Sequence, residues 1–328
     1  MDIFGNLLLG LSVAITPVNL AFLFAGVMMG MLVGIIPGFG PAAGIAILLP
    51  ITYNLDPAGA VIMLSAIYYG AMYGGTITSI LLNTPGESAS VASTFDGYPL
   101  AQQGRAGPAL VMQAVASFVG GTIGVILITV FAPLFALVTR SFGPPEFFLL
   151  VMMGLMTLIV MIEGNWRYGV ISALVGFALG TVGVDLDTGQ TRFTFGSAEM
   201  IGGIDFIPIA IGLFGLGELY YAFYQGLHLS GAGGIVQYDK EKRFWPDWAD
   251  YVETRFAMLR ASVLGFVIGV IPGAGATIAS LMSYSMEKTL SKTPEKFGKG
   301  AMAGVAGPEA ANNAASSGAM VPLLSLGL

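Results

Sequence analysis

Long apolar segments recur along the whole chain and limit the folds that it can adopt. Such segments cover residues 17–36, 57–82, 109–138, 145–162, 168–183, 204–225, 256–271 and 301–326. A helix of about 20 apolar residues crosses a hydrocarbon core of roughly 30 Å. Only 10% of the 328 residues are charged, whereas about 25% is usual in soluble domains. We therefore predict an all-α polytopic membrane protein, with one transmembrane domain over residues 1–328.

The positions of basic residues predict the orientation of the chain. They form two groups, Lys240, Lys242, Arg243, Arg255 and Arg260 around one loop, and Lys288, Lys292, Lys296 and Lys299 in another. Because basic loops face the cytoplasm, both groups are placed there, the connection at 185–200 outside and the one at 83–107 inside. Residues 3–15 are too short to span comfortably and are expected to form an interfacial or tilted helix. No Lys or Arg precedes Arg105, so the first apolar segment is expected to be retained rather than cleaved.

Several enzyme classes are disfavoured by what the sequence lacks. It has no Cys and a single His, at position 228. This composition excludes a thiol nucleophile and a Cys-ligated metal, and it argues against an intramembrane hydrolase. No GxxxxGK[ST] phosphate loop occurs, which argues against ATP hydrolysis. We therefore expect a protein that is not an enzyme.

A short motif occurs twice and indicates an internal repeat. Residues 32–41 read LVGIIPGFGP and residues 267–276 read VIGVIPGAGA, at a constant offset of 235. The matched pairs are Gly34 with Gly269, Pro37 with Pro272, Gly38 with Gly273, and Gly40 with Gly275. A short apolar segment follows each motif, at 41–53 and 275–286, and is a half-helix candidate. Four special residues in the same apolar context favour a true duplication.

The repeat predicts the organisation of the chain. GGTITSILL (74–82) aligns with GAMVPLLSL (318–326) if the second copy contains about nine additional residues. These lie in the Lys-rich loop, which contains Lys288, Lys292, Lys296 and Lys299. The predicted parts are the first repeat core at 17–110, intervening helices at 111–225, a cytoplasmic polar loop at 226–255, and the start of a second, incomplete repeat at 256–328. An odd number of crossings between the repeats inverts their topology, and we prefer this arrangement. If 41–53 alone fails to cross, the repeats are parallel instead.

The two Pro-Gly turns are candidate binding elements. Broken helices at corresponding positions of two repeats are typical of transporter binding sites, where irregular backbone lines a cavity. Pro37 ends a helix, while Gly38 and Gly40 permit positive φ, and the helix that starts near Pro41 offers N–H groups to an anion. In the second copy Gly273 and Gly275 repeat this arrangement and Thr277 adds a hydroxyl. The alternative is that these glycines only allow close helix packing.

Two polar islands interrupt the apolar sequence. The first, LLNTPGESASVAS (81–93), contains Asn83, Thr84, Pro85, Gly86, Glu87, Ser88 and Ser90. Its donors can bind a carboxylate while carbonyls of the preceding helix hold Na⁺; the alternative is a helix cap made by Thr84 or Ser88. The second, GPEAANNAASSGAMVP (307–322), contains Glu309, Asn312, Asn313, Ser316 and Ser317 and is expected to face a cavity. The ion-coupling candidates are Glu87, Glu218, Glu309, Ser316 and Ser317.

Three segments resemble the large membrane subunit of the tripartite tricarboxylate transporters. They are GIIPGFGP, YYGAMYGGTITSILLNTPGESASVASTFDGYPLAQQGRAGPAL and GPEAANNAASSGAMVPLLSLGL. The resemblance covers essentially the whole chain. It implies a subunit of the bacterial inner membrane that imports citrate or another carboxylate, driven by a Na⁺ or H⁺ gradient and without a cofactor. It also implies two protein partners, a small membrane subunit and a periplasmic solute-binding protein, and no nucleic acid.

The chain departs from this family in its length. The family's large subunit is around half as long again, and a further Pro-Gly turn follows the equivalent of LLSLGL, where this chain ends. The second counterpart of Thr84-Pro85-Gly86 is therefore missing, and a truncated chain is the simpler expectation. The alternatives are a channel-like or scaffold subunit, or a non-functional fragment. The substrate itself stays open, because a helix start accepts a mono-, di- or tricarboxylate.

Overall fold

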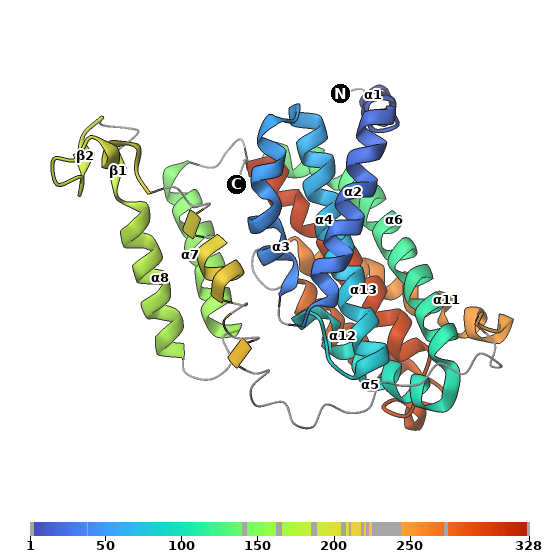
Figure 1. Ribbon diagram of the computed structural model, residues 1–328. Helices are drawn as coiled ribbons and strands as arrows, with labels where there is room; N and C mark the ends of the chain where they lie inside the picture. The colour runs from blue at the N-terminus through green and yellow to red at the C-terminus, as the bar shows by residue number, and fades with distance from the viewer. Residues whose placement is uncertain are drawn as a thin grey trace.

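The computed structural model describes residues 3–37, 39–139, 143–161, 166–184, 189–204, 208–209, 211–217, 220, 223–224, 244–271 and 275–326. This part of the chain is mainly helical (Figure 1). The α-helices are α1 (Ile3–Ala14), α2 (Pro17–Ile35), α3 (Gly40–Leu48), α4 (Pro57–Leu82), α5 (Val91–Leu100), α6 (Ala106–Thr139), α7 (Pro144–Met161), α8 (Trp166–Gly180), α11 (Trp248–Gly269), α12 (Gly275–Leu290) and α13 (Ala303–Leu326).

Short elements connect these helices. Turns of 3-10 helix are η1 (Leu49–Asn54), η2 (Ser88–Ser90), η4 (Glu199–Gly202) and η6 (Pro294–Lys296), and π-helical turns are η3 (Ala101–Arg105) and η5 (Ile211–Leu216). One small departure from the all-α prediction is an antiparallel ribbon of β1 (Gly183–Val184) and β2 (Thr191–Arg192), in which Gly183 pairs with Arg192. Strand β2 falls within the connection at 185–200, which was predicted to lie on the outer side of the membrane, and β1 lies just before it.

Three helical segments among the described residues are long and apolar enough to cross a membrane. They are α2, α4 and the continuous run Ser88–Phe135, which includes η2, α5, η3 and most of α6. The predicted spans at 17–36, 57–82 and 109–138 are therefore confirmed as candidates. Helices α7, α8, α11 and α13 coincide with four further predicted spans, and their crossing of the membrane stays a prediction.

Local sequence signals explain the bounds of α4, which are those predicted. The side chain of Asp56 accepts a hydrogen bond from the backbone N–H of Gly59 at 3.0 Å, so it caps the helix start. Pro57 occupies the first helical position, where its missing N–H is not needed. Asn83 ends the helix in the left-handed conformation, with φ 55°.

Helix α11 begins earlier than predicted, at Trp248 instead of residue 256. The last eight residues assigned to the polar loop at 226–255 are therefore helical. Asp247 and Asp250 form a reciprocal cap, in which the N–H of Asp247 donates to Asp250 Oδ2 at 2.9 Å. Arg105 also donates to both oxygens of Asp250, at 2.7 and 2.8 Å, which holds this helix start against η3. The polar composition of residues 248–255 predicted a loop, although the cap residues Asp247 and Asp250 indicate a helix start.

Helices α2 and α4 pack backbone against backbone. A Cβ atom added to Gly34 would overlap the carbonyl oxygen of Ala71, and one added to Gly74 would overlap that of Met31. Such contacts are usual in membranes, where apolar side chains gain little by leaving lipid and small residues let helices approach closely. The two helices therefore form one tightly packed hairpin.

Helices α11 and α13 pack in the same way. A Cβ atom on Gly269 would overlap the carbonyl oxygen of Ala315, and one on Gly318 would overlap that of Phe266. Each α11 residue lies 235 positions after its α2 counterpart, and each α13 residue lies 244 positions after its α4 counterpart. The difference is the nine residues predicted to be added in the Lys-rich loop.

Helices α4 and α13 run in opposite directions. Tyr69 contacts Ser317 through their hydroxyls at 2.5 Å, whereas Thr76, two turns further along α4, donates to Glu309 at 2.6 Å. The residue numbers rise along one helix as they fall along the other. In Figure 1, α4 accordingly descends toward α5 while α13 ascends.

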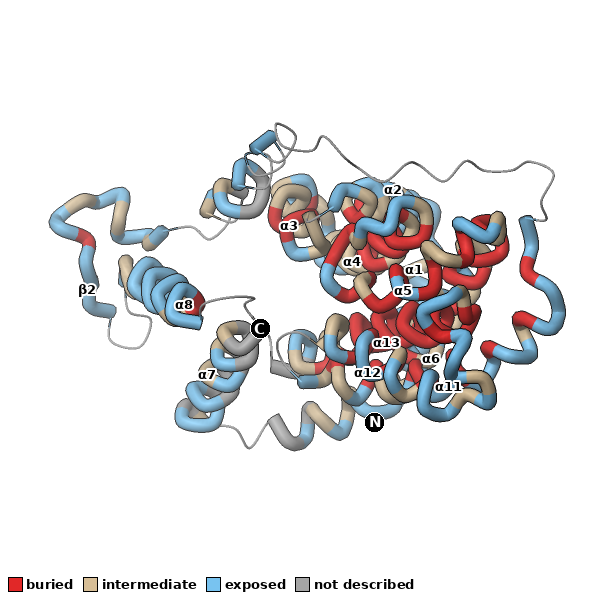
Figure 2. Tube along the Cα trace, turned by 90° about the horizontal axis from the view of Figure 1, so that it is seen from below, coloured by how far each residue is buried: buried red, intermediate tan, exposed pale blue. Residues whose placement is uncertain are grey.

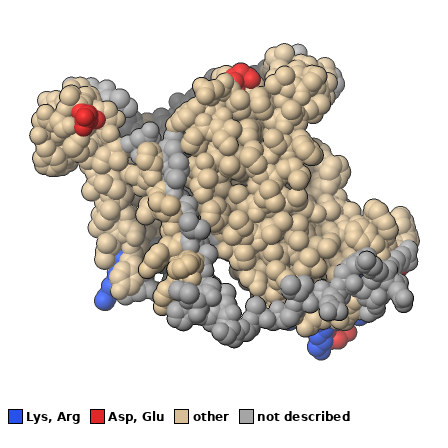
Figure 3. Space-filling model, viewed as in Figure 1, with Lys and Arg blue, Asp and Glu red and all other residues tan. Residues whose placement is uncertain are grey.

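The interior lies among the helices near both ends of the sequence. The largest apolar cluster joins α5, α6, α11 and α13 and includes the fully buried Leu100, Met112 and Val305. Figure 2 shows the buried residues gathered in this body, whereas α7 and α8 stand apart and are largely exposed. On the face drawn in Figure 3, Lys and Arg lie along the lower edge, below a wide uncharged band. This is the distribution expected when the band lies in hydrocarbon.

A buried carboxylate attaches the Lys-rich loop to this body. Asp96 of α5 is fully buried, and its Oδ1 accepts the backbone N–H groups of Gly298, Gly300 and Ala301 at 2.9, 2.7 and 2.7 Å. A charged acceptor forms stronger hydrogen bonds than a neutral one. Asp96 therefore fixes the end of the loop to α5, in addition to the hydrogen bonds that the loop forms within itself.

We expect Asp96→Asn to lower the free energy of unfolding by about 1 to 2 kcal/mol, because the charge that strengthens these hydrogen bonds is lost. Asp56→Asn is the matched control, since Asn caps helices as well as Asp does. Thermal unfolding of the detergent-solubilised protein measures both variants. Equal stability of the two variants would show that the charge of Asp96 does not matter.

Candidate functional site

The loop after α4 folds back into the protein. The N–H of Gly86 donates to the carbonyl oxygen of Gly75 at 3.1 Å, and Gly86 lies so close to the Gly34 carbonyl that a Cβ atom would overlap it. Gly75 lies seven residues before the last residue of α4, which corresponds to roughly 10 Å along the helix. The loop therefore brings polar backbone and side chains up to the level of Gly75.

Glu87 caps the short helix η2 at the inner end of this loop. Its Oε2 accepts the N–H of Ala89 at 2.7 Å, and Ser90 Oγ donates to the Glu87 carbonyl at 2.8 Å. The cap alternative is thus correct in kind, but the capping residue is Glu87 and not Thr84 or Ser88. Thr84 Oγ1 instead donates to the carbonyl of Leu82 at 3.2 Å, because the chain has not yet turned inward there.

The two predicted Pro-Gly elements meet at this loop. Gly40, at the start of α3, has φ 58°, and a Cβ atom there would lie 3.9 Å from Cβ of Glu87. On the other side, Ser88 Oγ and Thr277 Oγ1, in the first turn of α12, are 2.7 Å apart. The starts of α3 and α12, which are 235 residues apart in sequence, therefore both adjoin η2.

The glycines of the motif have different roles. Gly34 and Gly269 pack against a neighbouring backbone, as the packing alternative predicted, and Gly275 lies against Gly269. Gly40 is the one described glycine of these turns with positive φ, which is the conformation that a glycine adopts without strain. Pro37 is exposed at the end of α2. The predicted site residues Gly38 and Gly273, and Pro272 beside Gly273, lie outside the described residues.

Glu309 is the centre of the second polar island. It is fully buried in α13, and both its oxygens accept hydrogen bonds. Oε2 accepts from Thr76 Oγ1 at 2.6 Å and Asn312 Nδ2 at 3.4 Å, and Oε1 accepts from Ser117 Oγ at 2.5 Å and Asn313 Nδ2 at 3.1 Å. The carboxylate thus joins α4, α6 and α13 through neutral donors.

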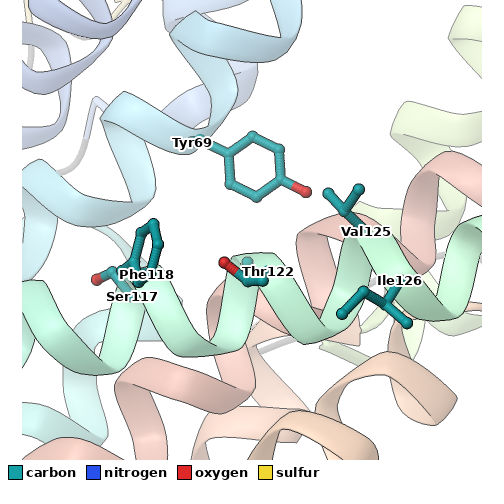
Figure 4. A pocket seen from close by; sticks show the side chains of 7 residues that line it. Tyr69, Ser117, Phe118, Thr122, Val125 and Ile126 are labelled. Carbon is teal, nitrogen blue, oxygen red and sulfur yellow. The ribbon is translucent and has the colours of Figure 1, made fainter. Parts of the chain in front are cut away.

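A pocket of about 420 Å³ adjoins this island. Tyr69 of α4 contributes one wall and α6 the other (Figure 4). The lining residues are Tyr69, Ser117, Phe118, Gly121, Thr122, Val125 and Ile126. Ser117 lines the pocket and also donates to Glu309, so one hydroxyl separates the mainly apolar pocket from the buried carboxylate.

The two polar islands are neighbours. Glu87 contacts Gly75, the residue before Thr76, which binds Glu309. Tyr68 of α4 lies beside both Ser316 and Glu87. The structure therefore groups Gly40, Gly86, Glu87, Ser88, Ser90 and Thr277 around η2, next to Glu309, Asn312, Asn313, Ser316 and Ser317. Asn83 and Thr84 stay at the exposed end of α4, followed by Pro85, and Glu218 lies outside the described residues.

Sequence reasoning missed the partners that α4 and α6 supply. Tyr68, Tyr69, Thr76 and Ser117 lie within helices that otherwise have an apolar character. Their contacts with α13 join residues 192 to 248 positions apart, which no local pattern reveals. The available signal was the hydroxyl-bearing residues inside predicted spans, since polar side chains there generally face a partner or a cavity.

These features define a class, that of helical membrane proteins in which interrupted helices meet around buried polar side chains. The family model described as the Tripartite tricarboxylate transporter TctA family matches residues 20–328. The chain belongs to this family, whose members are transporters and not enzymes. The description of the family names a tripartite transporter.

Two similar proteins come from Agrobacterium vitis. One, described as an uncharacterized 52.8 kDa protein in the TAR-I ttuC' 3' region, is 46% identical over all 328 residues of this chain. The chain covers 64% of the length of that relative. The other, an uncharacterized protein in the TAR-II ttuC' 3' region, is 58% identical over 64 residues, which are 20% of this chain and 26% of the relative. No solved structure matches the chain.

Proposed function

We propose that the chain is part of the membrane subunit of a secondary transporter that imports a carboxylate across the bacterial inner membrane. An ion gradient of Na⁺ or H⁺ drives the import. The convergence of the α3 and α12 starts on η2 carries this proposal, because two interrupted helices that meet around one loop form a typical substrate site in such transporters.

We propose that the chain contains an inverted repeat, and the packing of its helices supports this part of the proposal. The α2–α4 and α11–α13 hairpins share the glycine contacts, and each has another helix, α3 or α12, between its two helices. Equivalent residues are 235 positions apart in α2 and α11, and 244 positions apart in α4 and α13. The opposite directions of α4 and α13 support an inverted relation between the two units. Inverted repeats allow a transporter to present one site to either side of the membrane in turn.

The chemistry around η2 suits a carboxylate. The starts of α3 and α12 carry the positive end of the helix dipole, and Ser88 and Thr277 add hydroxyl donors. We propose citrate as the representative substrate, together with a small membrane subunit and a periplasmic solute-binding protein as partners. A binding protein that delivers the substrate accounts for a site built mainly from backbone and hydroxyl groups.

Uptake of labelled citrate into cells that contain this chain and both partners tests the function. Uptake should saturate and should stop when the ion gradient is collapsed. Calorimetry of citrate binding to the purified chain tests the site without a complete transport cycle. The absence of both citrate binding and citrate uptake would overturn the proposal. Uptake that does not saturate and needs no gradient would indicate a channel instead.

Thr277→Val should weaken citrate binding about 3- to 10-fold, since one hydrogen-bonding hydroxyl is worth about 0.5–1.5 kcal/mol. Thr181→Val is the matched control, because the Thr181 hydroxyl is exposed and donates to a carbonyl of its own helix end. The control should bind as the unmodified chain does. Unchanged affinity of Thr277→Val would remove α12 from the site.

A further inference from the structure

The two buried carboxylates of the candidate site, those of Glu87 and Glu309, differ in their hydrogen bonding. Both oxygens of Glu309 accept from neutral donors, as described above. Glu87 is only 8% exposed, and its Oε2 accepts from the N–H of Ala89. Its Oε1 has no hydrogen-bond partner among the described residues. The structure thus leaves one buried carboxylate oxygen unsatisfied beside the proposed substrate site.

No described basic side chain balances a charge on Glu87. Among the described residues, Arg105 pairs with Asp250 and Arg260 pairs with Glu287, away from η2. The titratable groups that face Glu87 are Tyr68 of α4 and Glu309 of α13. From α12 the neighbouring group is the Thr277 hydroxyl, through Ser88, and α5 begins with uncharged residues.

An ionised Glu87 would be unfavourable for three reasons. It would be a buried charge without a counter-ion, it would repel the neighbouring Glu309, and it would repel a carboxylate substrate. A bound cation or a proton removes all three. The choice between them depends on which oxygens around Glu87 are free to act as ligands.

The neighbouring oxygens favour a proton. The Gly75 carbonyl already accepts from Gly86 N–H, Thr78 Oγ1 and Ser79 Oγ at 3.1, 3.1 and 3.0 Å. The carbonyl of Ser90 accepts from Ser79 Oγ, and that of Glu87 accepts from Ser90 Oγ. A metal ion needs several free oxygens, whereas a proton needs only the unpaired Oε1.

We propose that Glu87 binds a proton on Oε1 in this conformation, while Glu309 remains the charged carboxylate. The proton comes from water that reaches the exposed Ser88 and forms an O–H bond to Oε1. It returns to water when Glu87 ionises. This inference rests on the proposed function in naming H⁺ as the coupling ion. The proton binding itself does not depend on transport.

Infrared spectroscopy of the purified full chain in lipid nanodiscs tests the proposal. We expect the carbonyl-stretch band of a protonated carboxylic acid at neutral pH, and its loss at high pH. Glu87→Gln, which keeps the side-chain shape, should abolish the band. Glu309→Gln is the matched control and should retain it. A band that survives in Glu87→Gln, or that is absent from the unmodified chain, would overturn the proposal.

Two further measurements keep the test independent of folding and of transport. Dicyclohexylcarbodiimide, which modifies protonated buried carboxyl groups, should label Glu87 and not Glu309 in the unmodified chain, as read by mass spectrometry. Replacing choline chloride by NaCl at constant pH should leave the infrared band unchanged. Labelling of Glu309 alone, or loss of the band in Na⁺, would overturn the assignment. If citrate uptake fails while the band behaves as expected, only the proposed function is contradicted.

Discussion

Gly34→Val and Gly269→Val are each expected to lower the free energy of unfolding by about 3 kcal/mol, because overpacking of this kind forces backbone to move. The new Cβ atom would overlap the carbonyl oxygen of Ala71 or Ala315, and a backbone oxygen cannot rotate away as a side chain can. The hairpins would have to separate along their length. Thermal unfolding in detergent and the yield of monodisperse protein measure the effect.

Gly176→Val is the matched control, since nothing lies within 4 Å of a Cβ atom on that glycine of α8. The substitution has the same chemistry and the same helical setting, and it should change stability little. If Gly34→Val were as stable as Gly176→Val, helices α2 and α4 would not be in backbone contact. If only one of Gly34→Val and Gly269→Val were destabilising, the two hairpins would not be equivalent.

Glu309→Ala should destabilise the protein by about 3 to 5 kcal/mol, because it opens a void and leaves buried donors without an acceptor. The donors concerned are the hydroxyls of Thr76 and Ser117 and the amide of Asn312, whereas the Asn313 amide keeps the Glu309 carbonyl and Asn312 Oδ1 as acceptors. Since they come from three helices, the loss should loosen α6 and α4 from α13. Thermal unfolding and hydrogen exchange of α13 amides measure the two effects.

Two variants separate this effect from a general loss of charge. Glu309→Gln keeps the shape and one acceptor, so it should cost only about 1 to 2 kcal/mol. Glu146→Ala removes an exposed carboxylate that caps α7, through the N–H of Gly143, and should have the smallest effect. Equal stability of Glu309→Ala and Glu309→Gln would show that the hydrogen bonds of Glu309 contribute nothing.

Much of the fold could be predicted because it depends on local signals. Asp56 and Pro57 define the start of α4, and the apolar runs define α2 and α6 to within a few residues. The repeat was predictable because the glycines that form the contacts within the hairpins are the residues that recur in the two copies of the motif. The start of α11 was missed because the residues from Trp248 onward are polar, although the cap at Asp247 and Asp250 is a local signal.

The candidate site was predictable in composition but not in connectivity. The polar islands contain Glu87, Ser88 and Glu309, and the second turn supplies Thr277, all of which were named from the sequence. Their separation into a carboxylate with four donors and one with a free oxygen follows from contacts across α4, α6 and α13. Such contacts depend on tertiary packing, so a single sequence with no internal cue to the packing cannot provide them.

The glycine contacts also determine where conformational entropy is lost. A backbone contact between Gly34 and Ala71, or between Gly269 and Ala315, restricts no rotatable side chain, so each hairpin forms without that entropic penalty. The junction between the hairpins depends instead on rotatable hydroxyls, those of Ser88, Thr277 and Thr76. The contacts within each hairpin are therefore made by backbone, whereas these contacts between the hairpins are made by side chains whose hydroxyls can rotate.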